Sequence, residues 1–544
     1  MKKIGLLIGI LLLTGNIGLF AQGNEVDAFT LSNTELSGTA RSMAMAGAFG
    51  ALGGDISVLS SNPAGLGIYR SSEISGTLDL SMVKTSSDWS GITMDWNKTR
   101  FAPNNFGFTL YFPTSSGSVR NWNLGFSYNR LKNYKRSYRM SNNGGGNSMA
   151  DYAAWRASNA FGYGEGIAED DLTYVKGSYD PYYNKQLSGH WLSILGFESG
   201  MFDNYVGSDG NYQSSFGYNT NGNWEVDVPY KSSLIVNESG HMDEYNIGFG
   251  LNVSNFLFLG ASLSVTDIDY KYSSYYDENY IYDEKTDDYL YLENSLNTEG
   301  TAFSVNVGAI VNLQMLRLGV AYNSPRWYDM TDYYIAWAGT EIHGYDDPRI
   351  DNKTPLDEYS EYRFRTPEKW IFSTAVILGQ SALISADYEM TNYKNMKYSD
   401  RDGDSNGFGN EYIKDDYTWG HTLRLGTEIK VDPQFAVRAG YMMQTSPMKE
   451  HLANNDVEVL PSGTIPHFTV TSKPTNYYTV GLGYRFTPNF YMDLACIYRY
   501  NSAHAYAFSN TYDDSIDGNV EIFSEPAKLK TKSTRVALTL GYKF

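Results

Sequence analysis

The sequence predicts an all-β protein: a transmembrane, antiparallel β-barrel of about fourteen strands with one large, partly helical extracellular loop. Three observations lead to this prediction. Beyond residue 21, no uninterrupted apolar run reaches the eighteen residues that a membrane-spanning helix needs. From Ser72 onward, stretches of alternating side chains are separated in turn by long polar segments and by very short turns. The chain also ends on a strand of unbroken alternation, and only a closed barrel can span a bilayer with strands.

The composition fits such a barrel. Of 544 residues, 15% are aromatic, yet the mean hydropathy is −0.40. A wall in which alternate residues face lipid, joined by polar loops, combines these two properties. The net charge of −19 opposes nucleic-acid binding, which needs clustered Lys and Arg. Cys496 is the single cysteine, so no internal disulfide is possible, and we expect it to be a small packing residue in a strand.

Residues 1–21 have the features of a secretory signal peptide. Lys2 and Lys3 precede the apolar run from Ile4 to Leu13, and Ala21 offers a cleavage site before Gln22. The run is too short to remain as a membrane helix, and no cysteine follows it that could carry a lipid anchor. With the barrel, this segment places the protein in the cell outer membrane.

The next segment is rich in small residues and turn signals. Ala40 to Leu52 carries Ala, Met and Gly at nearly every position, which favours short, closely packed helical turns. Asn62 can cap the turn that follows, and Pro63 at its first position loses no needed donor.

The same segment resembles the amino-terminal hatch of the FadL-type outer-membrane transporters of fatty acids and hydrocarbons. The resemblance rests on Gly38-Thr39-Ala40-Arg41-Ser42, Gly47-Ala48-Phe49, Gly53-Gly54-Asp55 and Asn62-Pro63-Ala64-Gly65-Leu66. It implies a fourteen-stranded barrel, residues 72–544, plugged by a hatch, residues 22–71. The hatch or gate residues that it implies are Gly53, Gly54, Asp55, Asn62, Pro63 and Ala64.

The resemblance also implies lateral release of ligand through a kink in the third strand, here residues 121–138. A basic stretch accompanies that strand and could attract a carboxylate or, alternatively, meet lipid phosphates. It comprises Arg130, Lys132, Lys135, Arg136 and Arg139.

Fourteen strands are predicted, and the turns between them assign the two rims. The strands start near Ser72, Asn104, Asn121, Asp243, Phe256, Asn297, Leu316, Glu361, Ser381, Thr418, Pro433, Thr475, Pro488 and Thr531. Short turns such as Ser254-Asn255 and Gly379-Gln380 should face the periplasm. The long segments should face outward: residues 85–103, 140–242, 273–296, 340–359, 397–417, 449–473 and 509–530. Glycines inside strands, as in Gly248-Phe249-Gly250, should face the lumen and leave room for a plug.

The segment 140–242 is far longer than a simple connection, so we expect it to be functional or structured. Residues 148–160 and 186–202 have helical apolar patterns. Their side chains either form a small core of their own or bind a greasy ligand. The candidate ligand-binding residues are Trp155, Trp191, Leu192, Leu195, Phe197, Met201 and Phe202.

Asp402, Asp404 and Asn406, followed by Gly407, match the first half of a calcium-binding loop. The second half fails, because Ile413 stands where a bidentate Glu is needed. The alternatives are a calcium site and a solvated acidic turn, and no other cofactor is predicted.

The sequence contains no motif typical of an enzyme active site. The seven His are scattered without zinc-ligand spacing, and neither a G-x-S-x-G elbow nor a P-loop occurs. His190, beside Trp191, is an alternative candidate for an axial haem ligand.

The last strand justifies the barrel most clearly. Val536, Leu538, Leu540, Tyr542 and Phe544 lie on one face, which must be the lipid side. A chain ending on Phe after such alternation resembles the signal recognised by the barrel-assembly machinery.

We therefore expect a passive, monomeric transporter of hydrophobic small molecules, most plausibly long-chain fatty acids, captured by an apolar cap and released through a hatch-gated barrel. Outer-membrane lipid and lipopolysaccharide surround it. The alternative is a surface receptor or adhesin that binds haem, glycan or host protein through the large loop. A water-filled porin is disfavoured by the plug.

Overall fold

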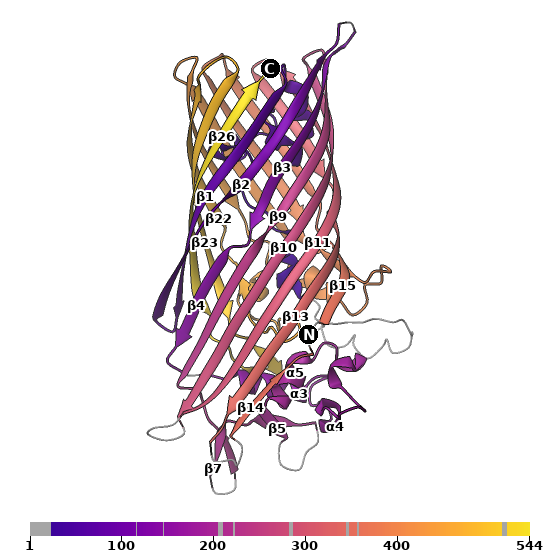
Figure 1. Cartoon of the computed structure of the whole chain (residues 1–544), viewed down its shortest axis with the longest axis vertical. Coiled ribbons are helices and arrows are strands. Elements are labelled where there is room, and N and C mark those ends of the chain that lie inside the picture. Colours follow the sequence, from indigo (N-terminus) through magenta and orange to yellow (C-terminus); the bar gives the residue numbers. More distant parts are fainter. Residues whose placement is uncertain are drawn as a thin grey trace.

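The computed structural model describes residues 23–544 except 116, 145, 205–209, 221–222, 282–286, 344–347, 356–357 and 514–518. The predicted signal peptide lies outside these residues. In the described part of the chain, fourteen antiparallel strands form a closed barrel (Figure 1), because β1 (Glu73–Trp89) pairs with β26 (Ala527–Lys543) from Glu73↔Lys543 to Asp88↔Lys528.

Between these two, several wall strands consist of two segments. In order around the barrel, the first are β2 (Ile92–Pro113), β3 (Val119–Asn133) with β4 (Arg136–Asn142), β9 (Lys231–Val253), β10 (Leu257–Ile281) and β11 (Asp287–Leu313). The next are β12 (Leu316–Asn323) with β13 (Trp327–Glu341), β16 (Lys369–Leu378) with β15 (Glu358–Arg365), and β17 (Ala382–Asn392), and the short strand β18 (Lys397–Ser399) pairs with β15. The last are β19 (Trp419–Lys430), β20 (Phe435–Gln444), β22 (Thr475–Arg485) and β23 (Phe490–Tyr506), which also pairs with the short strand β21 (Phe468–Val470).

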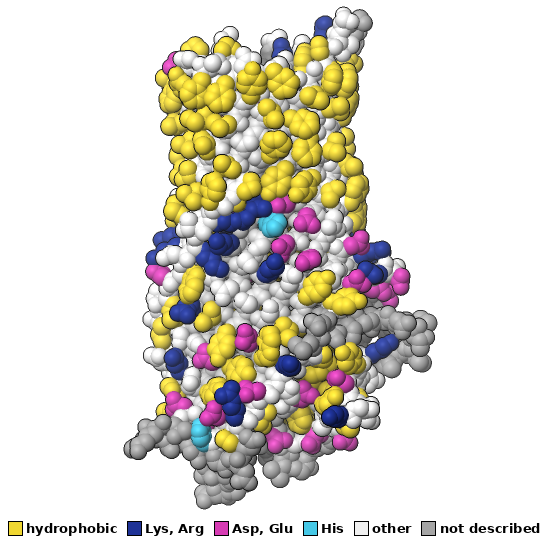
Figure 2. Space-filling model, viewed as in Figure 1, with side chains coloured by type: hydrophobic (Ala, Val, Ile, Leu, Met, Phe, Trp, Pro, Cys, Tyr) yellow, Lys and Arg dark blue, Asp and Glu magenta, His cyan; other side chains and the backbone are white. Residues whose placement is uncertain are grey.

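The period-two pattern of the last strand is confirmed. Leu540 and Tyr542 are 46% and 49% exposed on the outside, whereas Ala537 and Thr539 are buried on the inside. Similar outward side chains on the other strands form the apolar belt in Figure 2, which covers the part of the barrel nearer the C-terminus. None of the helices in the described residues is long and apolar enough to cross a membrane.

Strand starts at the short-turn rim agree with the prediction, and so do two starts at the other rim, Trp419 and Thr475, but other strands that start there begin earlier than predicted. The observed starts are Ile92 instead of Asn104, Lys231 instead of Asp243, Asp287 instead of Asn297, and Ala527 instead of Thr531. Most of the expected loops 85–103 and 273–296, and the two ends of the expected loop 140–242, are therefore strand. Beyond the apolar belt the outer face of the wall is largely polar (Figure 2), whereas inward side chains of the extensions, such as Leu234, Val236, Leu290 and Leu292, are buried in one core with the cap. The outward apolar face that identifies the other strand segments is therefore missing from these extensions.

The hatch, residues 23–71 in the structure, lies inside the barrel (Figure 1). It contains α1 (Glu25–Ser32), α2 (Ala40–Ala44), and the 3-10 turns η1 (Ile56–Ser60) and η2 (Pro63–Ile68). Its turns start as the sequence predicts, because Asn62 accepts a hydrogen bond from the Ala64 N–H (3.2 Å) with Pro63 at the first position.

A cap, residues 143–230, covers the rim opposite the C-terminus (Figure 1). It comprises α3 (Met149–Ser158), α4 (Glu169–Leu172), η3 (Pro181–Tyr183), η4 (Lys185–Leu187), α5 (Trp191–Glu198), β5 (Phe202–Asn204), β6 (Tyr212–Ser214), β7 (Gly217–Thr220) and β8 (Asn223–Val226). Shorter elements on the same rim are β14 (Arg349–Lys353), η5 (Tyr393–Asn395), α6 (Asn410–Asp416), α7 (Glu450–Ala453), β24 (Thr511–Asp513) and β25 (Asn519–Ile522).

Candidate functional site

The hatch is wedged against wall glycines. A Cβ on Gly260 would meet backbone atoms of Pro63 and Ala64 at under 3.0 Å, and one on Gly250 would lie 2.5 Å from Leu66. On the opposite wall, a Cβ on Gly440 would lie 2.6 Å from the Ala46 nitrogen. Only glycine admits such close approach, so these positions are where the barrel accommodates its plug.

Asn62 joins the hatch to itself and to the wall. Its Nδ2 donates to the Gly50 carbonyl (2.6 Å) and lies 3.5 Å from the Ala309 carbonyl of β11. The side chain is 1% exposed. Because the Gly50 backbone is buried, the amide that satisfies its carbonyl holds the turn in one position.

Gly53, Gly54 and Asp55 form the turn that precedes η1. Both glycines have positive φ, +61° and +66°, which favours glycine. Asp55 accepts hydrogen bonds from the Thr39 hydroxyl (2.6 Å) and the Ser57 N–H (3.0 Å), so one carboxylate ties α2 to η1.

Ion pairs fix the hatch to the lumenal wall. Arg41 lies 3.0 Å from Glu428 of β19, which also pairs with Arg438 of β20 at 2.6 Å. Arg438 reaches Asp493 of β23 at 2.6 Å. Glu428, Arg438 and Asp493 are buried, so removing one of their partners would leave a charge uncompensated.

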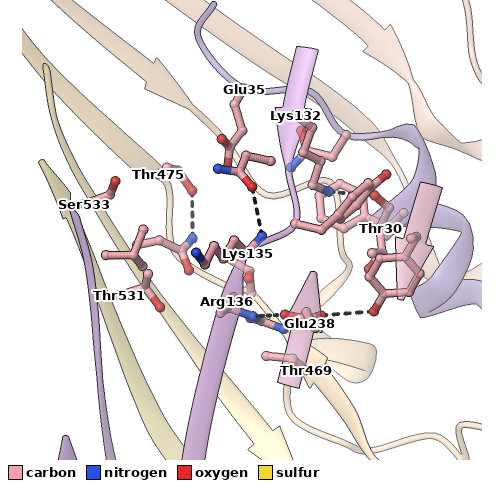
Figure 3. Close-up of a pocket in the computed structure, with 18 of the residues that line it drawn as sticks. Thr30, Glu35, Lys132, Lys135, Arg136, Glu238, Thr469, Thr475, Thr531 and Ser533 are labelled. Atoms are coloured by element: carbon pink, nitrogen blue, oxygen red, sulfur yellow. Dashed lines mark hydrogen bonds and ion pairs between the residues drawn. The ribbon is translucent and has the colours of Figure 1, made fainter. Parts of the chain in front are cut away.

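A cavity of about 210 Å³ lies between the N-terminal part of the hatch and the wall, and we call it the strand-3 cavity. Figure 3 shows its lining: Lys132, Lys135 and Arg136 come from the third wall strand, Thr30 and Glu35 from the hatch, and Thr531 and Ser533 from β26. Apolar and aromatic side chains complete the lining, among them Val26, Phe29, Tyr134, Tyr138, Leu296 and Phe468.

The strand-3 cavity carries an excess of positive charge. Its lining includes eight Lys and Arg but four Asp and Glu. Arg136 pairs with Glu238, Arg499 with Glu35, and Arg535 with Asp79. In the described part of the chain, no ion pair involves Lys132 or Lys135, whose ammonium groups donate to the carbonyls of Thr30 (2.6 Å) and Thr99 (3.0 Å).

The cavity abuts a break in the wall, which we call the strand-3 break. β3 ends at Asn133 and β4 starts at Arg136. β4 pairs with β9, but the ladder between β2 and β3 ends at Asn105↔Asn129, so in the described residues the remainder of β2 has no ladder with β4. The interruption falls within the predicted third strand, residues 121–138.

Side chains bridge the strand-3 break. The Arg139 guanidinium lies 5.0 Å from the Trp96 ring centre, and the Ser87 hydroxyl donates to the Arg139 carbonyl. These contacts, with that of Lys135 to Thr99, take the place of a backbone ladder. The wall is therefore held here by groups that can rotate away.

The structure places the predicted cap residues in a packed core. Trp191, Leu192, Leu195, Met201 and Phe202 are at most 2% exposed, with Phe197 partly buried against them and Trp155 half-buried. Trp191 packs on Tyr182 and Tyr334. None of these seven residues lines the strand-3 cavity.

His190 precedes α5 in the same cap, with its ring at the edge of Phe161. Burial, together with nearby Arg156, lowers the pKa of His190 to about 3. Burial raises the pKa of Glu198, at the other end of α5, to about 7, although the Tyr182 hydroxyl donates to it.

Asp402, Asp404 and Asn406 lie in an exposed turn before α6. Asp404 accepts from the Asn406 N–H (3.0 Å), which stabilises the turn itself. In the described residues, no three His, Cys, Asp or Glu side chains cluster closely enough to hold a metal ion.

Several cavity residues were not singled out from the sequence, notably Glu35, Glu238, Arg499 and Arg535. Arg535 could have been found, because it shares the inward face of the last strand with Ala537 and Thr539. The partner of Glu238 lies 102 positions away and Glu35 and Arg499 are 464 positions apart, so no local pattern marks them.

Comparisons with known proteins agree with this architecture. The family model described as "Outer membrane protein transport protein (OMPP1/FadL/TodX)" matches residues 242–544. A crystal structure of a Pseudomonas aeruginosa FadL homologue shares the fold, with a TM-score of 0.50 and 12% identity over 94% of this chain and 100% of that chain.

Two further solved structures show lower similarity. They are the P. putida toluene transporter TodX (TM-score 0.46, 13% identity, 94% and 99% coverage) and the Ralstonia pickettii toluene transporter TbuX (0.44, 12%, 94% and 99%). The comparison with curated proteins finds no significant match.

Proposed function

Because the chain belongs to the OMPP1/FadL/TodX family of outer-membrane transport proteins, and therefore carries hydrophobic molecules across the outer membrane, we propose that its ligands are long-chain fatty acids or similar carboxylate amphiphiles. The observation that carries this proposal is the composition of the strand-3 cavity. A carboxylate head group suits Lys132 and Lys135, and a hydrocarbon tail suits the aromatic and aliphatic walls of the cavity.

The charge distinguishes this ligand class from a neutral hydrocarbon. Lys132 and Lys135 already donate to backbone carbonyls, and a carboxylate would give each a stronger, charge-assisted hydrogen bond. A neutral aromatic hydrocarbon can offer these lysines only a weaker cation–π contact. Each buried methylene of a tail contributes about 0.8 kcal/mol, so affinity should rise with chain length.

In this proposal, ligand enters past the cap, binds with its head group at Lys132 and Lys135, and leaves sideways through the strand-3 break into the membrane. The bridging contacts of Arg139 and Lys135 would then have to release. The apolar cap residues around Trp191 serve as a first binding surface only when their packed core opens.

The hatch acts as the gate in the same proposal. Thr30 and Glu35 belong to the hatch and also contact the strand-3 cavity. A ligand that displaces Thr30 from Lys132 would therefore disturb the chain leading to Gly53, Gly54, Asp55, Asn62, Pro63 and Ala64.

The test is binding of a fluorescent long-chain fatty acid to purified protein in detergent. The double variant Lys132→Gln, Lys135→Gln should bind roughly tenfold or more weakly, since two charge-assisted hydrogen bonds are lost. Lys84→Gln, which changes an exposed lysine on the outer wall, is the matched control. Tight binding of toluene, equal in both variants, with no fatty-acid binding would refute the proposed ligand class. Binding of haem or glycan by the cap alone would favour a surface receptor.

A further inference from the structure

The barrel wall has a second interruption, away from the third strand. β12 ends at Asn323 and β13 starts at Trp327, while β15 ends at Arg365 and β16 starts at Lys369. The registers Asn323↔Lys369 and Trp327↔Arg365 leave Pro325 directly opposite Pro367. We call residues 324–326 and 366–368 the proline seam.

Hydrogen bonding across the proline seam is weak. Proline has no N–H, so neither Pro325 nor Pro367 can donate to the ladder. The Thr366 N–H donates to the Arg326 carbonyl (3.1 Å), but the Arg326 N–H is bonded to the Thr366 hydroxyl (3.0 Å) instead of a backbone carbonyl. A side-chain bond can exchange without moving either strand.

Side-chain alternation also fails at the seam. Asn323 and Arg326 both line the lumen although they are three residues apart, and so do Thr366 and Lys369. A regular strand returns to the same face after two residues. Each strand of the pair therefore carries one extra residue here, as at a bulge.

A lumenal cavity of about 120 Å³ lies against the inner side of the seam. Ser324, Thr366 and Pro367 line it, together with Gly47, Phe49 and Ser57 of the hatch. It is polar and contains the Lys369–Glu389 (3.5 Å) and Arg424–Glu389 (2.8 Å) ion pairs. Such a lining suits a polar or anionic head group and not a hydrocarbon tail.

The outer side of the same wall is hollowed and apolar. A groove of about 450 Å³ is lined by Val307, Gly308, Ala309, Val320, Ala321, Tyr322 and Trp370. Tyr322 and Trp370 are a cross-strand pair directly beside Asn323 and Lys369, which line the inner cavity. One strand pair thus separates a polar inner chamber from an apolar outer groove.

The inner cavity also adjoins the strand-3 cavity. Glu35 and Gln444 line both. Between them stand the Arg499–Glu35 ion pair and a hydrogen bond from the Gln444 amide to Asn33 (2.8 Å). Asn33 and Glu35 belong to the hatch, so movement of the hatch would join the two cavities.

We propose that the proline seam is a second lateral exit. A carboxylate amphiphile passes from the strand-3 cavity beyond Glu35 and Gln444, its head group rests near Lys369 and Arg424, and its tail leaves between β12 and β16 into the groove at Tyr322 and Trp370. The ligand class rests on the proposed function, whereas the opening of the seam does not.

A reversible disulfide tests the exit. Ser324 and Glu368 stand opposite each other by the same register, so Ser324→Cys with Glu368→Cys, in a Cys496→Ser background, should bridge the seam and keep both prolines. The control is Val437→Cys with Leu482→Cys, a directly opposed pair on the lipid face of β20 and β22, away from the seam and the groove. Oxidation should lower fatty-acid uptake about twofold or more relative to the reduced form across the seam, and leave the control unchanged. Equal uptake by both forms of the seam variant overturns the proposal.

A second experiment does not depend on uptake. In Asn323→Cys, also in the Cys496→Ser background, the thiol faces the inner cavity, and a phospholipid with a maleimide on its acyl chain reaches it directly through an opened seam. The control is Thr531→Cys in the strand-3 cavity, which a lipid entering by the strand-3 break would meet first. Labelling of residue 323 but not 531 supports the exit, and absence of labelling at residue 323, or labelling of residue 531 as well, overturns it. If the parent chain transports no fatty acid, the proposed function fails and this labelling still decides about the seam.

Ala309→Trp provides a variant without cysteines, because it fills the outer groove from the lipid side. We expect slower uptake, whereas Ala439→Trp on the lipid face of β20 should behave as the parent chain. Equal uptake in the two tryptophan variants would also count against the seam.

Discussion

Gly260→Ala tests how the hatch is held. The added Cβ would lie under 3.0 Å from the carbonyl carbon and oxygen of Pro63 and the nitrogen of Ala64. All three are backbone atoms, so no rotamer change relieves the clash, and Ala64 is fully buried. Overpacking of this kind costs about 1–3 kcal/mol. At about 2 kcal/mol, the balance between seated and displaced hatch shifts roughly 30-fold.

The assay is single-channel conductance in planar bilayers together with fatty-acid uptake by cells. We expect Gly260→Ala to open more often to small ions, because a displaced hatch leaves a gap, and to take up no more fatty acid than the parent chain. Gly76→Ala is the control, since its Cβ would meet only Phe106 at 3.7 Å. Unchanged conductance in a correctly assembled Gly260→Ala barrel would refute the argument that close glycine contacts seat the hatch.

Three further outcomes are expected. Arg41→Met removes one partner of buried Glu428 and should lower barrel stability in urea by about 2 kcal/mol, whereas Arg349→Met, at an exposed pair, should change it little. Burial lowers the pKa of His190 to about 3, so below pH 6.5 the unfolded cap binds a proton that the folded cap does not. The stability of the cap should therefore fall as the pH drops from 6.5 towards 3. Proteolysis of the cap should be less acid-sensitive in His190→Asn. Burial raises the pKa of Glu198 to about 7, so its contribution to the stability of the cap is present below pH 4.5 and lost as the pH rises through 7. Glu198→Gln should abolish that loss of stability in the same protease assay.

The sequence predicts the parts of this fold that local patterns determine. Alternation in the last strand identifies its lipid face, and Asn62-Pro63 identifies a capped turn, because both depend on residues only a few positions apart. The short-turn ends of the strands are located well for the same reason. The extensions of β2, β9 and β11 were missed, because they lack the outward apolar face of the belt; inward residues such as Leu234 and Leu290 pack in the core with the cap instead.

The candidate site is less predictable. The basic residues around Lys132 stand out in the sequence, and two of them line the cavity without a carboxylate partner in the described residues. Their surroundings depend on Thr30, Glu35 and Arg499, which only the closed barrel brings together. The proline seam arises from the pairing register of two strands, which Pro325 and Pro367 alone do not reveal.

The central claim is gated transport of a fatty acid through this barrel. The most direct measurement is the uptake of a labelled long-chain fatty acid by cells that lack their own transporter and express either the parent chain or Asn62→Ala, Pro63→Ala at equal outer-membrane level. We predict that the parent chain restores uptake and that the double variant does not. No uptake by a correctly assembled parent barrel would contradict the claim and would favour ligand capture by the cap instead.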